Sequence, residues 1–146
     1  TFSVSGRAKA FFSAAASEGL PTEVLYAEDQ GYEDARIGIN ETDRAIFGRI
    51  DGLFCSTDLM AIGALDALRI DLSIAVPEQI QVLGFDDIEQ ANWGSFNLST
   101  IRQDIDDQTY TVVRLLKERI ADNTLANRVE RQRLTVVLRG TTLHDG

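Results

Sequence analysis

The sequence predicts an α/β fold in which a parallel β-sheet is flanked by helices. Segments of strand-like and helix-like composition alternate along the chain, which favours parallel strands joined by helical crossovers. Two short segments, residues 52–56 and 80–85, are mainly apolar without strict alternation, as expected where helices cover both faces of a sheet. The length of 146 residues is enough for one domain and too short for two ordinary ones.

Helices are expected where apolar residues recur at helical spacing and a recognisable residue begins or ends the run. Ser3 or Ser5 can cap the first helix, and Gly19 ends it. Thr57 or Asp58 can cap a later helix, because their side-chain oxygens accept from free first-turn N–H groups. In chain order, the expected elements are helix 8–16, strand 22–26, helix 31–47, strand 52–56, helix 59–70, strand 80–85, extended segment 99–103, helix 105–121 and strand 133–138.

Composition and charge argue against several classes of protein. Fourteen basic and 23 acidic residues give a net charge of −9, which disfavours binding to nucleic-acid phosphates or to an anionic membrane. The single cysteine, Cys55, cannot form an internal disulfide, which fits a reducing compartment. With His144 as the only histidine, a His-dependent triad or a His–Cys zinc site lacks parts. No apolar run approaches the roughly 20 residues of a membrane span, so no membrane partner is expected.

The sharpest candidate for chemistry is the acidic pair Asp86 and Asp87, directly after strand 80–85. Ligands of such sheets bind beyond the carboxyl ends of the strands. The pair could bind a metal, accept a phosphoryl group, act as acid and base, or accept hydrogen bonds from ligand hydroxyls. Alternatively, one of them caps the turn and the other is solvated. Phosphoryl transfer needs a nearby cation, and neither Lys9 nor Lys117 follows a strand, whereas hydroxyl binding needs no cation.

Four further residues have both a structural and a functional interpretation. Thr57 faces the crevice if Asp58 caps the helix, or it is itself the cap. Arg7 lies near a helix N-terminus, where cations are unfavourable, so it is either a surface residue or a donor to a polar ligand. Tyr26 ends a predicted strand and either stacks on a ligand ring or belongs to the core. Trp93 is an interface anchor or a ligand platform.

Four segments, in this order along the chain, resemble motifs of the lactose-repressor (LacI/GalR) family of bacterial transcription regulators. Residues 31–35 read Gly-Tyr-Glu-Asp-Ala, and residues 54–65 read Phe-Cys-Ser-Thr-Asp-Leu-Met-Ala-Ile-Gly-Ala-Leu. Residues 76–88 read Val-Pro-Glu-Gln-Ile-Gln-Val-Leu-Gly-Phe-Asp-Asp-Ile, and residues 98–103 read Leu-Ser-Thr-Ile-Arg-Gln. Each motif alone is weak, but together they span most of the chain, and the chain is identified as a member of this family.

The resemblance implies a binding protein rather than an enzyme, with no cofactor or metal and a cytoplasmic location. Family members join a DNA-binding headpiece to a periplasmic-binding-protein-like core, whose two lobes close on a small effector, often a sugar or nucleoside. They act as homodimers. The implied effector-binding residues are Asp86, Arg7, Thr57, Tyr26, Gln103 and Ser3. The implied dimer surface contains Met60, Leu68 and Trp93. Thr57 departs from the family pattern, which has Asn there, so the usual amide contact with the effector is lost.

The resemblance also predicts how the chain divides between the two lobes. Residues 1–101 and 135–146 correspond to the second lobe, whereas residues 102–134 cross into the first lobe. The headpiece that would bind operator DNA, and most of the first lobe, lie outside this chain. Without that lobe, the apolar stripe of helix 105–121 loses its neighbours, so we expect the helix to be repositioned or to associate with a second copy.

Two other functions fit the same sequence features. An exported sugar-binding receptor of a transporter would have the same core but would carry a signal peptide in place of a headpiece. A small enzyme could use Asp86 and Asp87 to hold Mg²⁺, in which case Asp86→Asn should abolish the affinity for Mg²⁺. Binding of sugars without magnesium would argue against the enzyme.

Overall fold

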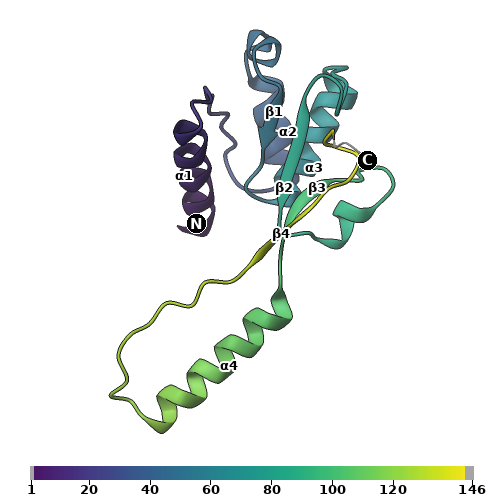
Figure 1. Ribbon diagram of the computed structural model, residues 1–146. Helices are drawn as coiled ribbons and strands as arrows, with labels where there is room; N and C mark the ends of the chain where they lie inside the picture. Colours follow the sequence, from purple (N-terminus) through teal and green to yellow (C-terminus); the bar gives the residue numbers. More distant parts are fainter. Residues whose placement is uncertain (1, 144–146) are drawn as a thin grey trace.

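The computed structural model describes residues 2–143, and the side chains of residues 6–143. Its centre is a four-stranded sheet of β1 (Gly52–Phe54), β2 (Gln81–Phe85), β3 (Ser99–Gln103) and β4 (Leu134–Val137), which lie in that order (Figure 1). The first three strands are parallel, as predicted. β4 is antiparallel to β3, because the chain leaves the sheet at the end of β3 and returns alongside it.

One face of the sheet is covered by α2 (Tyr32–Glu41) and α3 (Asp58–Asp66), which continues into the π-helical turn η2 (Ala67–Asp71). Apolar residues of α3, η2 and the strands form the core, because α3 presents a nearly all-apolar sequence to the sheet. The residues with no exposed surface include Ala61, Leu65, Ala67, Leu68, Ile80, Val82, Ala91 and Leu98. The predicted helix 31–47 divides here into α2 and the short 3₁₀ helix η1 (Arg44–Gly48), and a second 3₁₀ helix, η3 (Glu89–Asn92), follows β2.

Helix α1 (Phe2–Ser17) lies beside the sheet on the opposite side from α2 and α3 (Figure 1). It begins at Phe2, before the two serines expected to cap it, and ends at Ser17, two residues before Gly19, whose φ of +69° glycine adopts without strain. Phe11 stacks on Phe54 of β1 with ring centroids 4.8 Å apart. A largely apolar cavity of about 770 Å³ separates α1, residues 20–27, α2 and β1.

The strand predicted at residues 22–26 is wrong. This segment runs without strand pairing, and several of its side chains are exposed. A strand needs a neighbour to satisfy its backbone groups. β1 is an edge strand of the sheet, and the cavity lies between β1 and residues 22–26, so neither supplies a partner for the other.

Helix α4 (Ile105–Ala121) and the returning residues 122–133 form an arm that projects from the body (Figure 1). No residue of α4 is buried. Its charged side faces the returning segment, where Arg114 pairs with Glu130 and Arg128 pairs with Glu118. Its apolar stripe is exposed and includes Ile105, Val112, Val113, Leu116 and Ile120. Among residues 2–143, no helix is both long and apolar enough to cross a membrane.

Candidate functional site

Three of the predicted site residues meet at the carboxyl ends of β2 and β3. Asp86 follows β2 and accepts a hydrogen bond from Nη2 of Arg7, a salt bridge of 3.0 Å to its Oδ1. Nε2 of Gln103, the last residue of β3, donates to the same oxygen over 3.0 Å. Arg7 also donates from Nη1 to the carbonyl oxygen of Ser56, which follows β1 by two residues, over 2.8 Å. α1, β1, β2 and β3 therefore all contribute to one polar cluster, which we call the Asp86 cluster: Arg7, Ser56, Asp86 and Gln103.

The Asp86 cluster is accessible to solvent, and a contact with Phe85 fixes the orientation of its arginine. The side chains of Arg7 and Asp86 are 20% and 31% exposed, so a ligand can reach them. The Arg7 guanidinium carbon lies 3.9 Å from the ring centroid of Phe85, a cation–π contact that orients the arginine. Phe85 was not among the residues predicted for the site. Phe85 stands in the recognised Gly-Phe-Asp-Asp segment, but an apolar residue there reads as core.

The two neighbouring acids do not act as a pair. Asp87 turns away from Asp86 and binds Nη2 of Arg139 at 2.7 Å and Nε of Arg102 at 2.5 Å. Burial raises the pKa of Asp87, but hydrogen bonds and charges from Arg139 and Arg102 outweigh burial and hold the pKa below its usual value. Both acids have positive φ, +115° at Asp86 and +55° at Asp87, which is why successive side chains separate.

This separation argues against the magnesium enzyme. A shared metal site needs both carboxylates aimed at one point with free oxygens, whereas arginine donors occupy each carboxylate here. Within residues 2–143, no group of three or more His, Cys, Asp or Glu side chains is placed to hold a metal ion.

Thr57 is the N-cap of α3, and Asp58 is not. The Thr57 hydroxyl accepts from the backbone N–H of Met60 over 3.2 Å and lies 3.5 Å from the Gln30 carbonyl oxygen. The alternative in which Asp58 caps the helix and frees Thr57 is therefore wrong. Asp58 is completely buried and bonds outside its helix. Thr57 still lies next to Ser56, at the edge of the Asp86 cluster.

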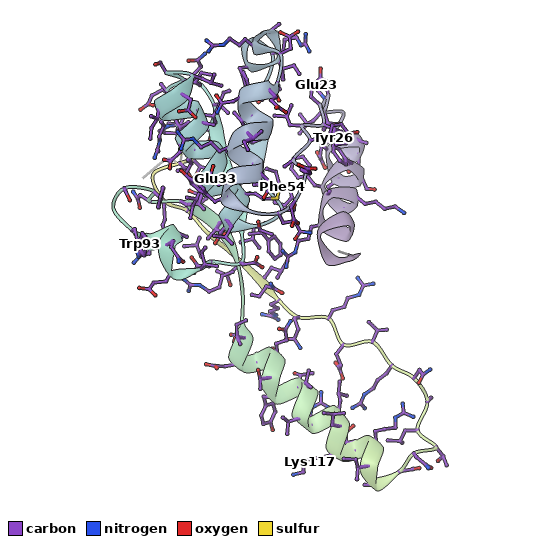
Figure 2. All side chains as sticks on the ribbon, turned by 180° about the vertical axis from the view of Figure 1, so that it is seen from behind. Glu23, Tyr26, Glu33, Phe54, Trp93 and Lys117 are labelled. Atoms are coloured by element: carbon purple, nitrogen blue, oxygen red, sulfur yellow. The ribbon has the colours of Figure 1, made fainter. Side chains whose placement is uncertain are left out.

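One predicted effector contact, Tyr26, does not join the Asp86 cluster. Tyr26 is 81% exposed and lines the cavity beside α1, because the strand expected to position it does not form. Figure 2 shows Tyr26 close to α1, well separated from Trp93. The side chain of Ser3 lies outside the described part of the chain, as does His144.

The predicted dimer residues differ strongly in exposure. Trp93 is 48% exposed and packs against Phe96, so it is available to a partner. Met60 is half-buried, with its sulfur 3.7 Å from the Ser56 hydroxyl oxygen. Leu68 is fully buried in the core, so its expected place on a dimer surface is wrong. It belongs to the turn of π-helix after α3, and its side chain faces the sheet side of that segment.

Comparison with known proteins shows which family this fold belongs to. The periplasmic binding protein-like domain family matches residues 3–142. The HTH-type transcriptional repressor PurR of Vibrio parahaemolyticus serotype O3:K6 is 30% identical over 136 residues, which is 92% of this chain and 40% of the repressor. The chain belongs to the LacI/GalR family. It spans less than half the length of this curated relative.

Solved structures of the LacI/GalR family agree in fold. A LacI-type transcription regulator from Bifidobacterium animalis subsp. lactis superposes with a TM-score of 0.80 at 28% identity, covering 94% of this chain and 50% of that one. A LacI family regulator from Arthrobacter sp. FB24, solved as a complex with lactose, gives a TM-score of 0.72 at 29% identity over 92% of this chain and 50% of that one. These relatives are transcription regulators and not enzymes, as predicted.

Proposed function

We propose that this chain is the effector-sensing part of a LacI-type transcription regulator, and that it holds a sugar-like effector without changing it. The convergence of Arg7, Asp86 and Gln103 on one point supports this proposal. A carboxylate has about four lone-pair sites and can accept from vicinal hydroxyls, while arginine and glutamine supply matching donors. Thr57, Tyr26 and Ser3 would complete the contacts when the second half of the binding site is present.

Sugar is the favoured effector class because hydrogen-bond donors (Arg7 and Gln103) and an acceptor (Asp86) meet at one solvent-accessible point. Phe85 is only 7% exposed and lies beneath the Arg7 guanidinium, so it orients that donor rather than contacting the effector. The similar Arthrobacter regulator was solved with lactose, which supports a saccharide ligand for this chain as well.

The proposed mechanism is a shift between two lobe arrangements. An effector changes the equilibrium only by binding one arrangement better than the other. Residues 1–101 and 135–146 would form one lobe, and residues 102–134 would belong to the other. Homodimers would form around Met60 and Trp93. Operator DNA would be bound in the cytoplasm by a headpiece that is not part of this chain.

Calorimetry with lactose, cellobiose, sucrose and ribose tests this proposal on the chain and on two variants. Asp86→Ala removes the acceptor at the centre of the cluster and should weaken binding at least tenfold, since a hydrogen bond to a charged group contributes about 1.5–3 kcal/mol. Asp43→Ala is the control, because Asp43 is an aspartate that accepts a hydrogen bond, from the backbone N–H of Ala45, but caps η1 outside the cluster. Binding must not require Mg²⁺. Equal affinities of Asp86→Ala and the unmodified chain would contradict the proposal.

A further inference from the structure

Among the acidic residues of the described chain, Asp58 is the most deeply buried. One of its hydrogen bonds reaches the loop after β2, which contains Asp86. Its side chain has no exposed surface. Oδ2 accepts from the backbone N–H of Ile88 over 2.9 Å, and Oδ1 accepts from the Thr100 hydroxyl over 2.5 Å. One carboxylate thus joins the start of α3 to the loop after β2 and to the middle of β3.

The loop after β2 has an unfavourable backbone conformation that needs such support. Asp86 and Asp87 both have positive φ, which residues other than glycine rarely adopt. Conformations of this kind persist only where surrounding contacts determine them. The backbone N–H of Asp86 is bonded to the Ile101 carbonyl oxygen over 2.9 Å, and the N–H of Ile88 is bonded to Asp58. These two hydrogen bonds hold the backbone at both ends of the Asp86–Asp87 turn.

Gly84 of β2 leaves space for the Asp58 carboxylate. A Cβ atom on Gly84 would lie 2.2 Å from Oδ1 of Asp58, closer than any real contact, so a side chain at 84 would displace the carboxylate. Burial raises the pKa of Asp58 and disfavours its charged form, while the hydrogen bonds from Thr100 and Ile88 favour that form. Neither Asp58 nor Gly84 touches the Asp86 cluster in any hydrogen bond of the described residues.

We propose that Asp58 is a positioning residue for the effector site. Through the Ile88 N–H, it holds the Asp86–Asp87 turn in the conformation that directs Asp86 toward Arg7 and Gln103, and Gly84 makes room for it. This inference rests on the proposed function for its consequence on binding, but its structural part concerns the unliganded chain and can be tested separately. Asp58 itself contacts no effector.

Two independent variants break the contact, and each has a matched control. Asp58→Ala removes the acceptor, whereas Asp58→Asn keeps an oxygen for Ile88 and an amide that can donate to the Thr100 hydroxyl. Gly84→Ala displaces the carboxylate without changing Asp58. Gly52→Ala makes the same substitution in β1, where an added Cβ meets nothing within 4 Å. If Asp58→Ala does not fold, Gly84→Ala and Asp58→Asn still test the proposal.

The first measurement is NMR of the unliganded chain and needs no effector. In Asp58→Ala and Gly84→Ala, the Ile88 amide should exchange with solvent at least tenfold faster. The coupling between the amide and α protons of Asp86, which is small at a φ of +115°, should increase. Asp58→Asn and Gly52→Ala should leave both unchanged. An unchanged Asp86 coupling in folded Asp58→Ala and Gly84→Ala overturns the proposal, as does an Asp58→Asn variant that behaves like Asp58→Ala.

The second measurement is calorimetry with lactose and cellobiose on the same variants. Asp58→Ala and Gly84→Ala should bind at least tenfold more weakly, and Asp58→Asn should bind within threefold of the unmodified chain. Failure of the unmodified chain to bind any of the sugars would count against the proposed function alone, because the NMR result would still establish or refute the positioning role. A changed Asp86 coupling with unchanged sugar affinity would overturn the link between Asp58 and the effector site.

Discussion

The salt bridges of Asp87 offer a direct test of how burial determines the strength of an ion pair in this fold. Asp87 binds two arginines, but its side chain is only 8% exposed, and the arginines differ sharply: Arg139 is 12% exposed and Arg102 is 52% exposed. Removing one partner of a buried pair leaves an uncompensated charge, so Asp87→Asn should lower the free energy of unfolding by about 2–4 kcal/mol at pH 7. Asparagine tolerates the positive φ at this position, so the substitution adds little backbone strain.

The two arginines should contribute unequally. Arg102→Gln should cost only about 0.2–1 kcal/mol, the usual range for an exposed ion pair. Arg139→Gln should cost clearly more, because Arg139 also donates to the Leu98 carbonyl oxygen over 2.7 Å. A double-mutant cycle between Asp87→Asn and Arg139→Gln removes that extra bond from the comparison and should give a coupling of about 1–3 kcal/mol.

The pH dependence has a definite sign. The pKa of Asp87 is lower in the folded chain than its ordinary value of 3.8, so the unfolded chain takes up the proton first as the pH falls. The stability from Asp87 is therefore fully present above pH 3.8 and is lost as the pH falls through the folded pKa. Urea unfolding followed by circular dichroism at several pH values measures this. A coupling near zero at pH 7, or an Arg102→Gln variant as unstable as Arg139→Gln, would refute the reasoning.

Three further predictions concern the core, the cysteine and the arm. Leu65→Ala, at a side chain with no exposed surface, should lower the free energy of unfolding by about 2–5 kcal/mol, visible as a lower urea midpoint; a change under 0.5 kcal/mol would mean that the site is not tightly packed. Burial, and secondly the charge of Asp58, raise the pKa of the Cys55 thiol to about 12. An alkylating reagent at pH 8 should therefore modify Cys55 only when urea unfolds the chain. Rapid labelling of the folded chain would contradict the burial of this thiol. The exposed stripe of α4 should make the chain self-associate with rising concentration in light scattering, and Leu116→Lys should reduce this; a monodisperse monomer with the stripe in solvent would contradict the expectation.

The order of elements and the centre of the site could be predicted because both depend on short-range patterns. The apolar run before Asp86 indicates a buried strand, and the rule that ligands bind at the carboxyl ends of parallel strands then points to Asp86. Gln103 was implied only by the family resemblance. The contact of Asp86 with Arg7 crosses 79 residues, and the residues alone left Arg7 open between a surface residue and a donor to a ligand.

The remaining features depend on long-range contacts that no local pattern encodes. Thr57 and Asp58 are both good capping residues, and the choice between them is made by Thr100 and Ile88, far along the chain. The opposite directions of Asp86 and Asp87 follow from two positive φ angles that acidic residues seldom adopt. Leu68 falls at a helical position compatible with either surface or core, and packing against the sheet decides for the core. Residues 22–26 have strand-like composition, but without a neighbour that composition does not produce a strand.

In the proposed effector site, Arg7 and Asp86 already satisfy each other through an ion pair. An effector must share or replace a contact that the protein already makes. Its affinity therefore reflects the difference in free energy between the Arg7–Asp86 ion pair and the contacts that the effector would form with the same two side chains. A molecule rich in hydroxyl groups can interpose donors and acceptors together and leave both charges solvated. An apolar molecule of the same size cannot, and a simple ion can satisfy only one of them, so the ion pair would itself favour hydroxyl-rich molecules at the proposed site.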